Sequence, residues 1–165
     1  MMRPKRAEPK PGQESVWDYP RPPRIEDSNK HIKVIFNNLL IADTSRAKRI
    51  LETSSPPVYY IPPTDIKMAH LIATRKNTFC EWKGIASYYT VVVSDKRAEN
   101  AAWFYTKPTS GYESIKDYVA FYPQKMDACY LDGELVKPQS GSFYGGWVIS
   151  EIVGPFRGEP GTEGW

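Results

Sequence analysis

One segment of the chain, Thr78–Tyr88, combines a thiol, an ammonium group and several aromatic rings. Cys80 precedes Lys83 by three positions, and a nearby positive charge favours the reactive thiolate form of a cysteine. The same pattern also describes a small buried cysteine beside a structural or solvated lysine. We favour that second interpretation, because no histidine within the segment could act as a base.

A second segment, Asn100–Tyr105, is rich in aromatic residues. In a strand, Trp103 and Tyr105 share a face. If this strand pairs with Ala86–Val93, one of the two rings can face Tyr88 or Tyr89 across the ladder. Packing in the core would explain such rings equally well. The functional interpretation is an aromatic cage for a flat, methylated or cationic ligand group.

Together these segments predict a ligand site formed by Lys83, Tyr88, Trp103 and Tyr105. Gly84 permits a bend that lets Lys83 point inward instead of along the sheet. An ammonium group at the rim of an aromatic pocket indicates an anionic or carbonyl-bearing ligand. Two functions follow. One is a module that binds a small molecule or a modified side chain, and the other is an enzyme that uses Cys80 as a nucleophile activated by Lys83.

Other chemistries find little support in the residues. The two cysteines, Cys80 and Cys129, form no CxxC pair, and His31 and His70 do not flank them at the spacing of metal ligands. We therefore expect neither a bound metal nor a cofactor. The chain has no glycine-rich phosphate-binding loop and no recognisable Ser/His/Asp set.

The composition indicates one globular domain that carries more aromatic surface than a small core needs. The 165 residues are 41% hydrophobic and 25% charged, which is ordinary for a folded protein. Aromatic residues reach 13%, with five Trp and eleven Tyr. Such side chains offer an apolar body and a polar tip, so part of this surface is expected to line a groove.

The net charge of +3 comes from the first ten residues, and the rest of the chain balances 18 positive against 18 negative residues. A nucleic-acid-binding protein usually carries its basic residues over the folded face, so we expect no nucleic-acid partner. No apolar segment follows the basic N-terminus and no stretch is long enough to span a membrane. These features predict a cytoplasmic protein with reduced thiols and no membrane partner.

Proline and glycine divide the chain into four parts. We expect a disordered basic arm over 1–12, a Pro-rich surface strap over 13–30, the folded domain over 31–139 and a Gly- and aromatic-rich strap over 140–165. In the first strap, Trp17 and Tyr19 are the expected anchors.

Short runs of strand-forming residues dominate the folded part. Ile32–Phe36 and Leu39–Asp43 predict a hairpin across two asparagines, and Met126–Leu131 with Glu134–Val136 predicts another across Asp-Gly. One helix is expected over Ser110–Tyr122, because Ile115, Tyr118, Val119 and Tyr122 follow helical spacing. The pattern predicts a mainly β, antiparallel domain with one short helix.

Four motifs in this order resemble a known family, the domain of unknown function 427. They are Pro57–Pro62, Cys80–Tyr88, Ala101–Tyr105 and Tyr118–Tyr122, and the resemblance extends from about Ile32 to Val136. The Trp17 strap and the tail that ends at Trp165 resemble the longer form found in bacteria, cyanobacteria included.

The resemblance implies an antiparallel β-tent fold, of the Mss4-like kind, in which two sheets meet at an angle. Proteins of that fold include zinc-bearing methionine sulfoxide reductases and aromatic-cage binding domains, which usually carry paired CxxC zinc ligands that this chain lacks. The family is sometimes labelled nucleotidyltransferase-like. The chain has no Gly-Ser pair followed by paired aspartates, so its sequence does not support that label.

Overall fold

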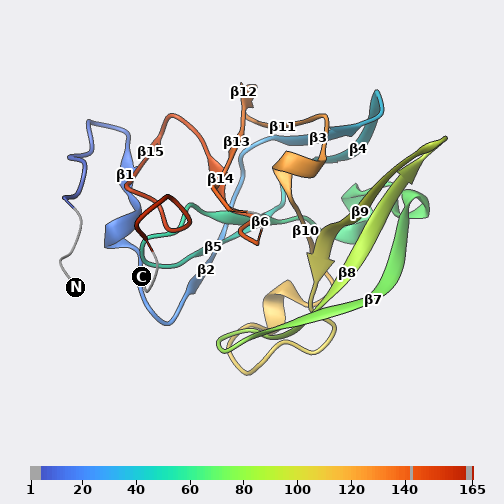
Figure 1. Ribbon diagram of the computed structural model, residues 1–165, viewed down its shortest axis with the longest axis horizontal. Coiled ribbons are helices and arrows are strands. Elements are labelled where there is room, and N and C mark those ends of the chain that lie inside the picture. The colour runs from blue at the N-terminus through green and yellow to red at the C-terminus, as the bar shows by residue number, and fades with distance from the viewer. Residues whose placement is uncertain (1–4, 142, 163–164) are drawn as a thin grey trace.

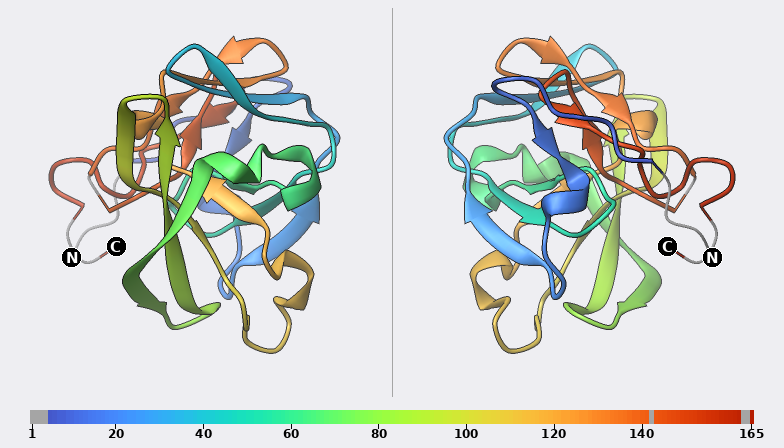
Figure 2. Two further views of the ribbon diagram at one scale, coloured as in Figure 1. Left: turned by 90° about the vertical axis from the view of Figure 1, so that its right-hand side faces the viewer. Right: turned by 90° about the vertical axis from the view of Figure 1, so that its left-hand side faces the viewer.

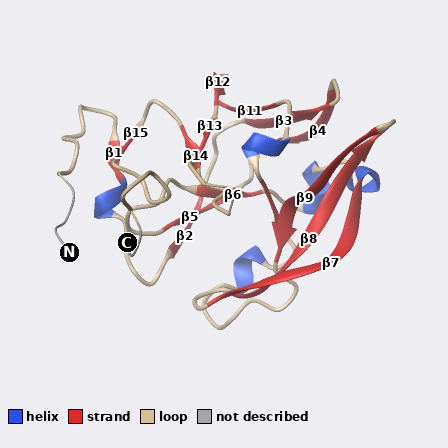
Figure 3. Cartoon of the chain, viewed as in Figure 1, coloured by secondary structure: helices blue, strands red, loops and turns tan. Residues whose placement is uncertain are grey.

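The computed structural model describes residues 5–141, 143–162 and 165. Within them the chain is mainly β, as the sequence predicts, and every helical segment is a 3-10 turn of three residues (Figures 1 and 3). The strands are β1 Glu14–Ser15, β2 Arg24–Asp27, β3 Ile32–Phe36, β4 Leu39–Thr44, β5 Lys48–Leu51, β6 Val58–Tyr60, β7 Leu71–Cys80, β8 Gly84–Val93, β9 Lys96–Phe104, β10 Val119–Phe121, β11 Ala128–Leu131, β12 Glu134–Leu135, β13 Lys137–Pro138, β14 Trp147–Val148 and β15 Ile152–Val153. The turns are η1 Val16–Asp18, η2 Pro63–Asp65, η3 Met68–His70, η4 Glu113–Ile115 and η5 Pro123–Lys125.

Two four-stranded antiparallel sheets dominate the fold, in the strand orders β10-β9-β8-β7 and β12-β11-β3-β4. A three-stranded antiparallel sheet, β2-β5-β6, lies to the left of β7–β10 in the view of Figure 1. In the left view of Figure 2, the long β8 and β9 strands run nearly vertically and the β3–β4 hairpin crosses the top of the molecule. The antiparallel, β-rich class is therefore confirmed.

The predicted hairpin between β3 and β4 forms across Asn37 and Asn38, whose φ angles are +47° and +64°. Two-residue hairpin turns that match the twist of the strands need positive φ at both positions, and asparagine tolerates this. The β11–β12 hairpin uses Asp132 and Gly133 in the same way, with φ of +48° and +81°. Local turn chemistry thus sets both connections.

The helix predicted over Ser110–Tyr122 is wrong. Gly111 and Asp117 have φ of +95° and +63°, which a right-handed helix cannot include. Between them lies only η4, and Val119–Phe121 then pairs with β9 as strand β10. All three residues of β10 are buried, so pairing with β9 and burial outweigh the helical spacing of the apolar residues.

The two ends of the chain pack against each other. Strand β1 pairs in parallel with β15, and Trp17 donates a 2.9 Å hydrogen bond from Nε1 to the carbonyl of Pro155. Val16 is fully buried and Tyr19 is nearly so, so residues 13–30 contribute to the core as well as to the surface. Of the predicted arm, residues 1–4 lie outside the described residues, and Ala7 donates a backbone hydrogen bond to Gly154.

Two groups of buried side chains stabilise the fold. The larger packs between β3, β4, β11 and the ends of the chain, and includes Ile32, Val34, Ile41 and Trp147. The smaller is aromatic and lies under β8, β9 and β10. Among the described residues, no helix is long and apolar enough to cross a bilayer.

Candidate functional site

A pocket of about 280 Å³ opens beside the smaller, aromatic group, where β6, β7, β8 and β9 meet the C-terminal segment. All five residues singled out from the sequence, Cys80, Lys83, Tyr88, Trp103 and Tyr105, line it. The other lining residues are Ile50, Glu52, Ser55, Pro56, Val58, Tyr60, Thr78, Phe79, Glu81, Trp82, Ala86, Tyr122, Gln139, Phe143, Tyr144, Gly145 and Arg157.

The pairing of β8 with β9 brings the predicted rings together. Tyr88 lies directly opposite Trp103 in the antiparallel ladder. Tyr105 follows two positions after Trp103, and both belong to the same buried group, as strand alternation requires. Both side chains are almost fully buried and border the pocket. Their rings therefore pack in the protein and form its wall at the same time.

Tyr60 of β6 lies at the centre of this wall. Its hydroxyl accepts a 3.2 Å hydrogen bond from Nε1 of Trp103, and the two rings meet edge to face with centroids 6.3 Å apart. The centroid of the Tyr105 ring lies 6.4 Å from that of Tyr60. Burial raises the pKa of the Tyr60 and Tyr105 hydroxyls, so both are neutral hydrogen-bonding groups at physiological pH.

Lys83 lies in the turn between β7 and β8. Gly84 has a φ of +106°, which confirms the predicted bend, and Thr109 donates a 3.0 Å hydrogen bond from its amide to the Lys83 carbonyl. The side chain is half-buried in the pocket wall. Burial opposes its charge, but Tyr60, Cys80 and Glu52 outweigh this effect, so the pKa of Lys83 lies above its usual value. Lys83 is therefore a cation at neutral pH.

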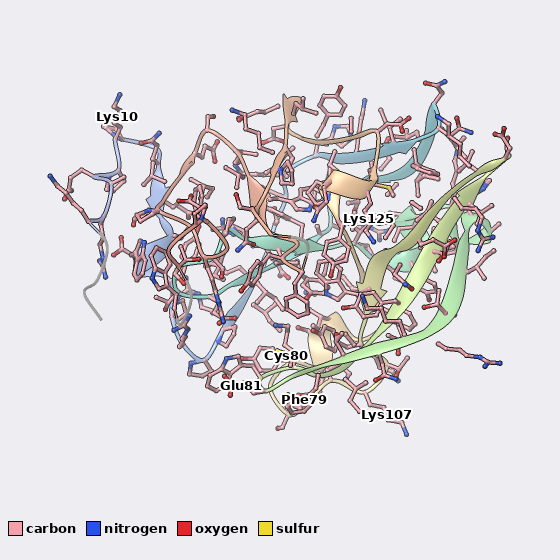
Figure 4. All side chains as sticks on the ribbon, in the orientation of Figure 1. Lys10, Phe79, Cys80, Glu81, Lys107 and Lys125 are labelled. Carbon is pink, nitrogen blue, oxygen red and sulfur yellow. The ribbon has the colours of Figure 1, made fainter. Side chains whose placement is uncertain are left out.

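Cys80 ends strand β7 opposite Gly84, and its half-buried side chain lines the same pocket as Lys83. Figure 4 places it beside Phe79 and Glu81 at the lower end of the β7–β8 hairpin. The second thiol, Cys129, is buried in the larger core, and burial raises its pKa to about 12. The two thiols therefore lie in different environments, and of the two Cys80 borders the pocket.

A family comparison matches residues 24–132 to the profile described as a domain of unknown function, DUF427. The chain belongs to this family. The resemblance noted in the sequence is thereby confirmed, and the matched part of the DUF427 domain contains Cys80, Lys83, Tyr88, Trp103 and Tyr105. No curated protein matches the chain.

Several lining residues of this DUF427 protein are not predicted by its sequence. Tyr60 belongs to a tyrosine pair that the sequence displays, but nothing local indicates that Tyr60 faces the pocket while Tyr59 packs against Trp147. Tyr122 falls in the segment for which the sequence wrongly predicts a helix. The centroid of its ring lies 4.6 Å from that of Trp103. Gly145 and Arg157 come from the C-terminal strap, whose contact with Trp103 no sequence signal predicts.

Two lysines cover tyrosine rings at the edge of the pocket. Nζ of Lys76 lies 4.7 Å from the centroid of the Tyr88 ring, and Nζ of Lys125 lies 5.6 Å from that of Tyr122. Lys125 lies well apart from Cys80 in Figure 4, and neither lysine is itself a lining residue of the pocket. Across the described parts of the chain, no cluster of His, Cys, Asp or Glu could hold a metal ion.

Proposed function

We propose that this DUF427 domain binds a small, flat organic anion in the aromatic pocket, with Lys83 as the counter-charge. The observation that carries the proposal is the state of Lys83. It is half-buried in a wall of aromatic rings, it is charged, and among the described residues no carboxylate lies within ion-pair distance of it. A ligand carboxylate beside this ammonium group would form a charge-assisted hydrogen bond with it, which is stronger than a bond between neutral groups.

The charges around the pocket argue against a cationic ligand such as a methylated lysine. Two of the lining rings, Tyr88 and Tyr122, already carry a lysine over one face, Lys76 and Lys125 respectively. Glu52, the half-buried carboxylate of the wall, pairs with Arg21 at 3.4 Å and with Arg157 at 3.7 Å. Of the two carboxylates that line the pocket, the half-buried Glu52 is thus already paired, and the other, Glu81, is exposed to solvent.

The size of the pocket favours a small ligand. Sites for drug-sized molecules usually measure about 300–1,000 Å³, and this pocket lies just below that range. The tyrosine and tryptophan rings supply flat walls, and their hydroxyl and N–H groups supply a few polar tips. Such a lining suits a ligand with one flat ring and a small number of polar substituents. A single ring that bears a carboxylate fits these dimensions.

Pairs of carboxylic acids and their neutral amides test this proposal in a thermal-shift screen. A ligand that binds only the folded protein raises its melting temperature by mass action. We expect one-ring acids to raise it, their amides to have little effect, and both Lys83→Met and Tyr88→Phe to abolish the response with the fold intact. Acids that shift Lys83→Met as much as the parent would refute the role of Lys83.

The alternative is an enzyme in which Cys80 attacks the bound molecule. It is supported by the presence of the Cys80 thiol and the Lys83 ammonium in one pocket. Cys80→Ser separates the two functions, because a binding module keeps its ligand response without the thiol. If the variant binds the acid but consumption of an added substrate depends on Cys80, the enzyme is the correct description.

A further inference from the structure

The pocket of this protein is completed by residues outside the matched part of the DUF427 family. The family match ends at residue 132. One side of the pocket, which we call the C-terminal wall, consists of Gln139, Phe143, Tyr144, Gly145 and Arg157. The opposite sides come from strands within the matched region. The shared domain thus supplies the cation and most of the rings, and the additional segment closes the site.

The C-terminal wall lies directly against the indole of Trp103. A Cβ atom placed on Gly145 would lie 2.1 Å from Cη2 and 2.8 Å from Cζ3 of Trp103. No other residue fits without a shift of the wall or the ring, because real Cβ atoms do not approach other atoms this closely. Gly145 is not among the positive-φ glycines, so close approach and not backbone conformation requires a glycine here.

Tyr144 is held in the C-terminal wall by two other glycines. Cβ atoms at Gly141 and Gly158 would each lie 2.9 Å from Cδ2 of its ring, so the ring packs directly on the backbone. The Arg157 guanidinium lies 5.7 Å from the centroid of the Tyr144 ring and also pairs with Glu52. The position of Tyr144 is therefore defined by close contacts on several sides.

Side chains of the matched region bind the backbone of the C-terminal wall. Tyr122 donates a 3.1 Å hydrogen bond to the carbonyl of Phe143, and Gln124 donates one of 3.2 Å to the carbonyl of Tyr144. Residues 143–146 belong to no strand. The wall is attached by separate bonds and not by a continuous ladder, so it can be loosened without disrupting a sheet.

We infer that the C-terminal wall, and Tyr144 in particular, limits the size of the anion that the pocket admits, so that smaller ring systems bind in preference to larger ones. This inference rests on the proposed function for the nature of the ligand. Residues of the matched region would bind the ring and the charge of the ligand, whereas the C-terminal wall would limit the space into which the ligand can extend. Truncation of Tyr144 would therefore enlarge the site without removing Lys83 or Trp103.

Alkylation of Cys80 tests the inference without a known ligand, because this thiol lines the pocket and Cys129 is buried. The probes are iodoacetamide, its N-phenyl derivative and its N-(1-naphthyl) derivative, which share one reactive group and differ in size. In the parent we expect the naphthyl reagent to react with Cys80 much more slowly than the phenyl reagent. Tyr144→Ala should raise the naphthyl-to-phenyl rate ratio about tenfold.

Two further variants complete the experiment. Gln124→Ala, at an exposed position, releases one bond to the wall and should raise the same ratio to a smaller extent. Leu135→Ala truncates an exposed side chain on β12, outside the pocket, and should leave the ratio unchanged. An unchanged ratio in both Tyr144→Ala and Gln124→Ala would overturn the inference. Failure of the proposed function would appear differently. Acids and amides would then give equal thermal shifts, while the naphthyl-to-phenyl rate ratio would still rise in Tyr144→Ala.

Discussion

The Nε1 group of Trp103 donates a hydrogen bond to the hydroxyl of Tyr60, and this bond joins strands β9 and β6 in one wall of the candidate pocket. Both residues are almost fully buried. A buried indole N–H needs an acceptor, and the Tyr60 hydroxyl provides it. The bond therefore fixes the orientation of the Trp103 indole in the pocket wall.

Replacing Tyr60 by phenylalanine should destabilise the protein by about 1–3 kcal/mol, because the buried N–H of Trp103 then lacks its acceptor. Chemical denaturation measures the loss. Tyr118→Phe is the control, since Tyr118 is only partly buried. Equal stability of parent and Tyr60→Phe would contradict the importance of this bond.

Gly145→Ala should cost about 1–3 kcal/mol, the usual range for inserting a methyl group into a packed site, because its Cβ collides with the Trp103 ring. Near-ultraviolet circular dichroism should change as well, since the environment of an indole is altered. Gly111→Ala serves for comparison. A Cβ added at Gly111 would meet open space, but the φ of this residue is +95°. We therefore expect Gly111→Ala to lose stability through backbone strain without the spectral change.

Native protein should present one reactive thiol. Cys129 is buried and its pKa is raised to about 12, so it stays protonated at pH 8, whereas Cys80 is half-buried at the pocket. Mass spectrometry after iodoacetamide treatment should detect one modification in the native parent, none in Cys80→Ser and two in the denatured parent. Modification of native Cys129 would show that the core opens on the time scale of the reaction.

Acid should weaken the attachment of the N-terminal segment. Arg49 donates two hydrogen bonds to Glu14, at 2.9 and 3.0 Å, and these lower the pKa of Glu14 against the opposing effect of burial. A depressed folded-state pKa gives stability that is present above the usual value of 4.5 and is lost as the pH falls through the lower, folded value. The difference in stability between the parent and Glu14→Gln should therefore be full at pH 7 and shrink below pH 4.5. A difference independent of pH would exclude the charge of Glu14 as its cause.

The basic arm should be dispensable for stability. It is basic and proline-rich, and its contacts include one backbone hydrogen bond from Ala7 and an exposed ion pair between Arg6 and Asp18. Exposed ion pairs contribute little. Deletion of residues 2–12 should leave the melting temperature nearly unchanged, and a fall of many degrees would show that the arm is part of the fold.

Several strands and two hairpins could be predicted because local chemistry determines them. Asn37-Asn38 and Asp132-Gly133 define their turns, and strand alternation places Trp103 and Tyr105 on one face opposite Tyr88. The prediction for Ser110–Tyr122 is wrong because its apolar spacing fits a helix. The positive φ of Asp117 interrupts a helix, and pairing with the edge of β9 makes Val119–Phe121 a strand. Local periodicity carries no information about a distant partner strand.

The same limit applies to the pocket. Residues within the motifs around Cys80 and Trp103 could be found because rings, a thiol and an ammonium group stand close together in the sequence. Glu52, Gly145 and Arg157 could not, because chain folding alone brings them to Trp103 and Lys83. The sequence therefore predicts the chemistry of one side of the pocket, and the structure adds the side that closes it.

Protection of Cys80 from iodoacetamide by a bound acid tests the central claim, that the pocket holds a small flat anion against Lys83, most directly. The probe pair is benzoate and benzamide, which share a ring and differ in charge. We predict that benzoate slows the alkylation of Cys80 in the parent, that benzamide does not, and that Lys83→Met abolishes the protection. Equal protection by benzoate and benzamide, protection that persists in Lys83→Met, or no protection by benzoate would contradict the claim.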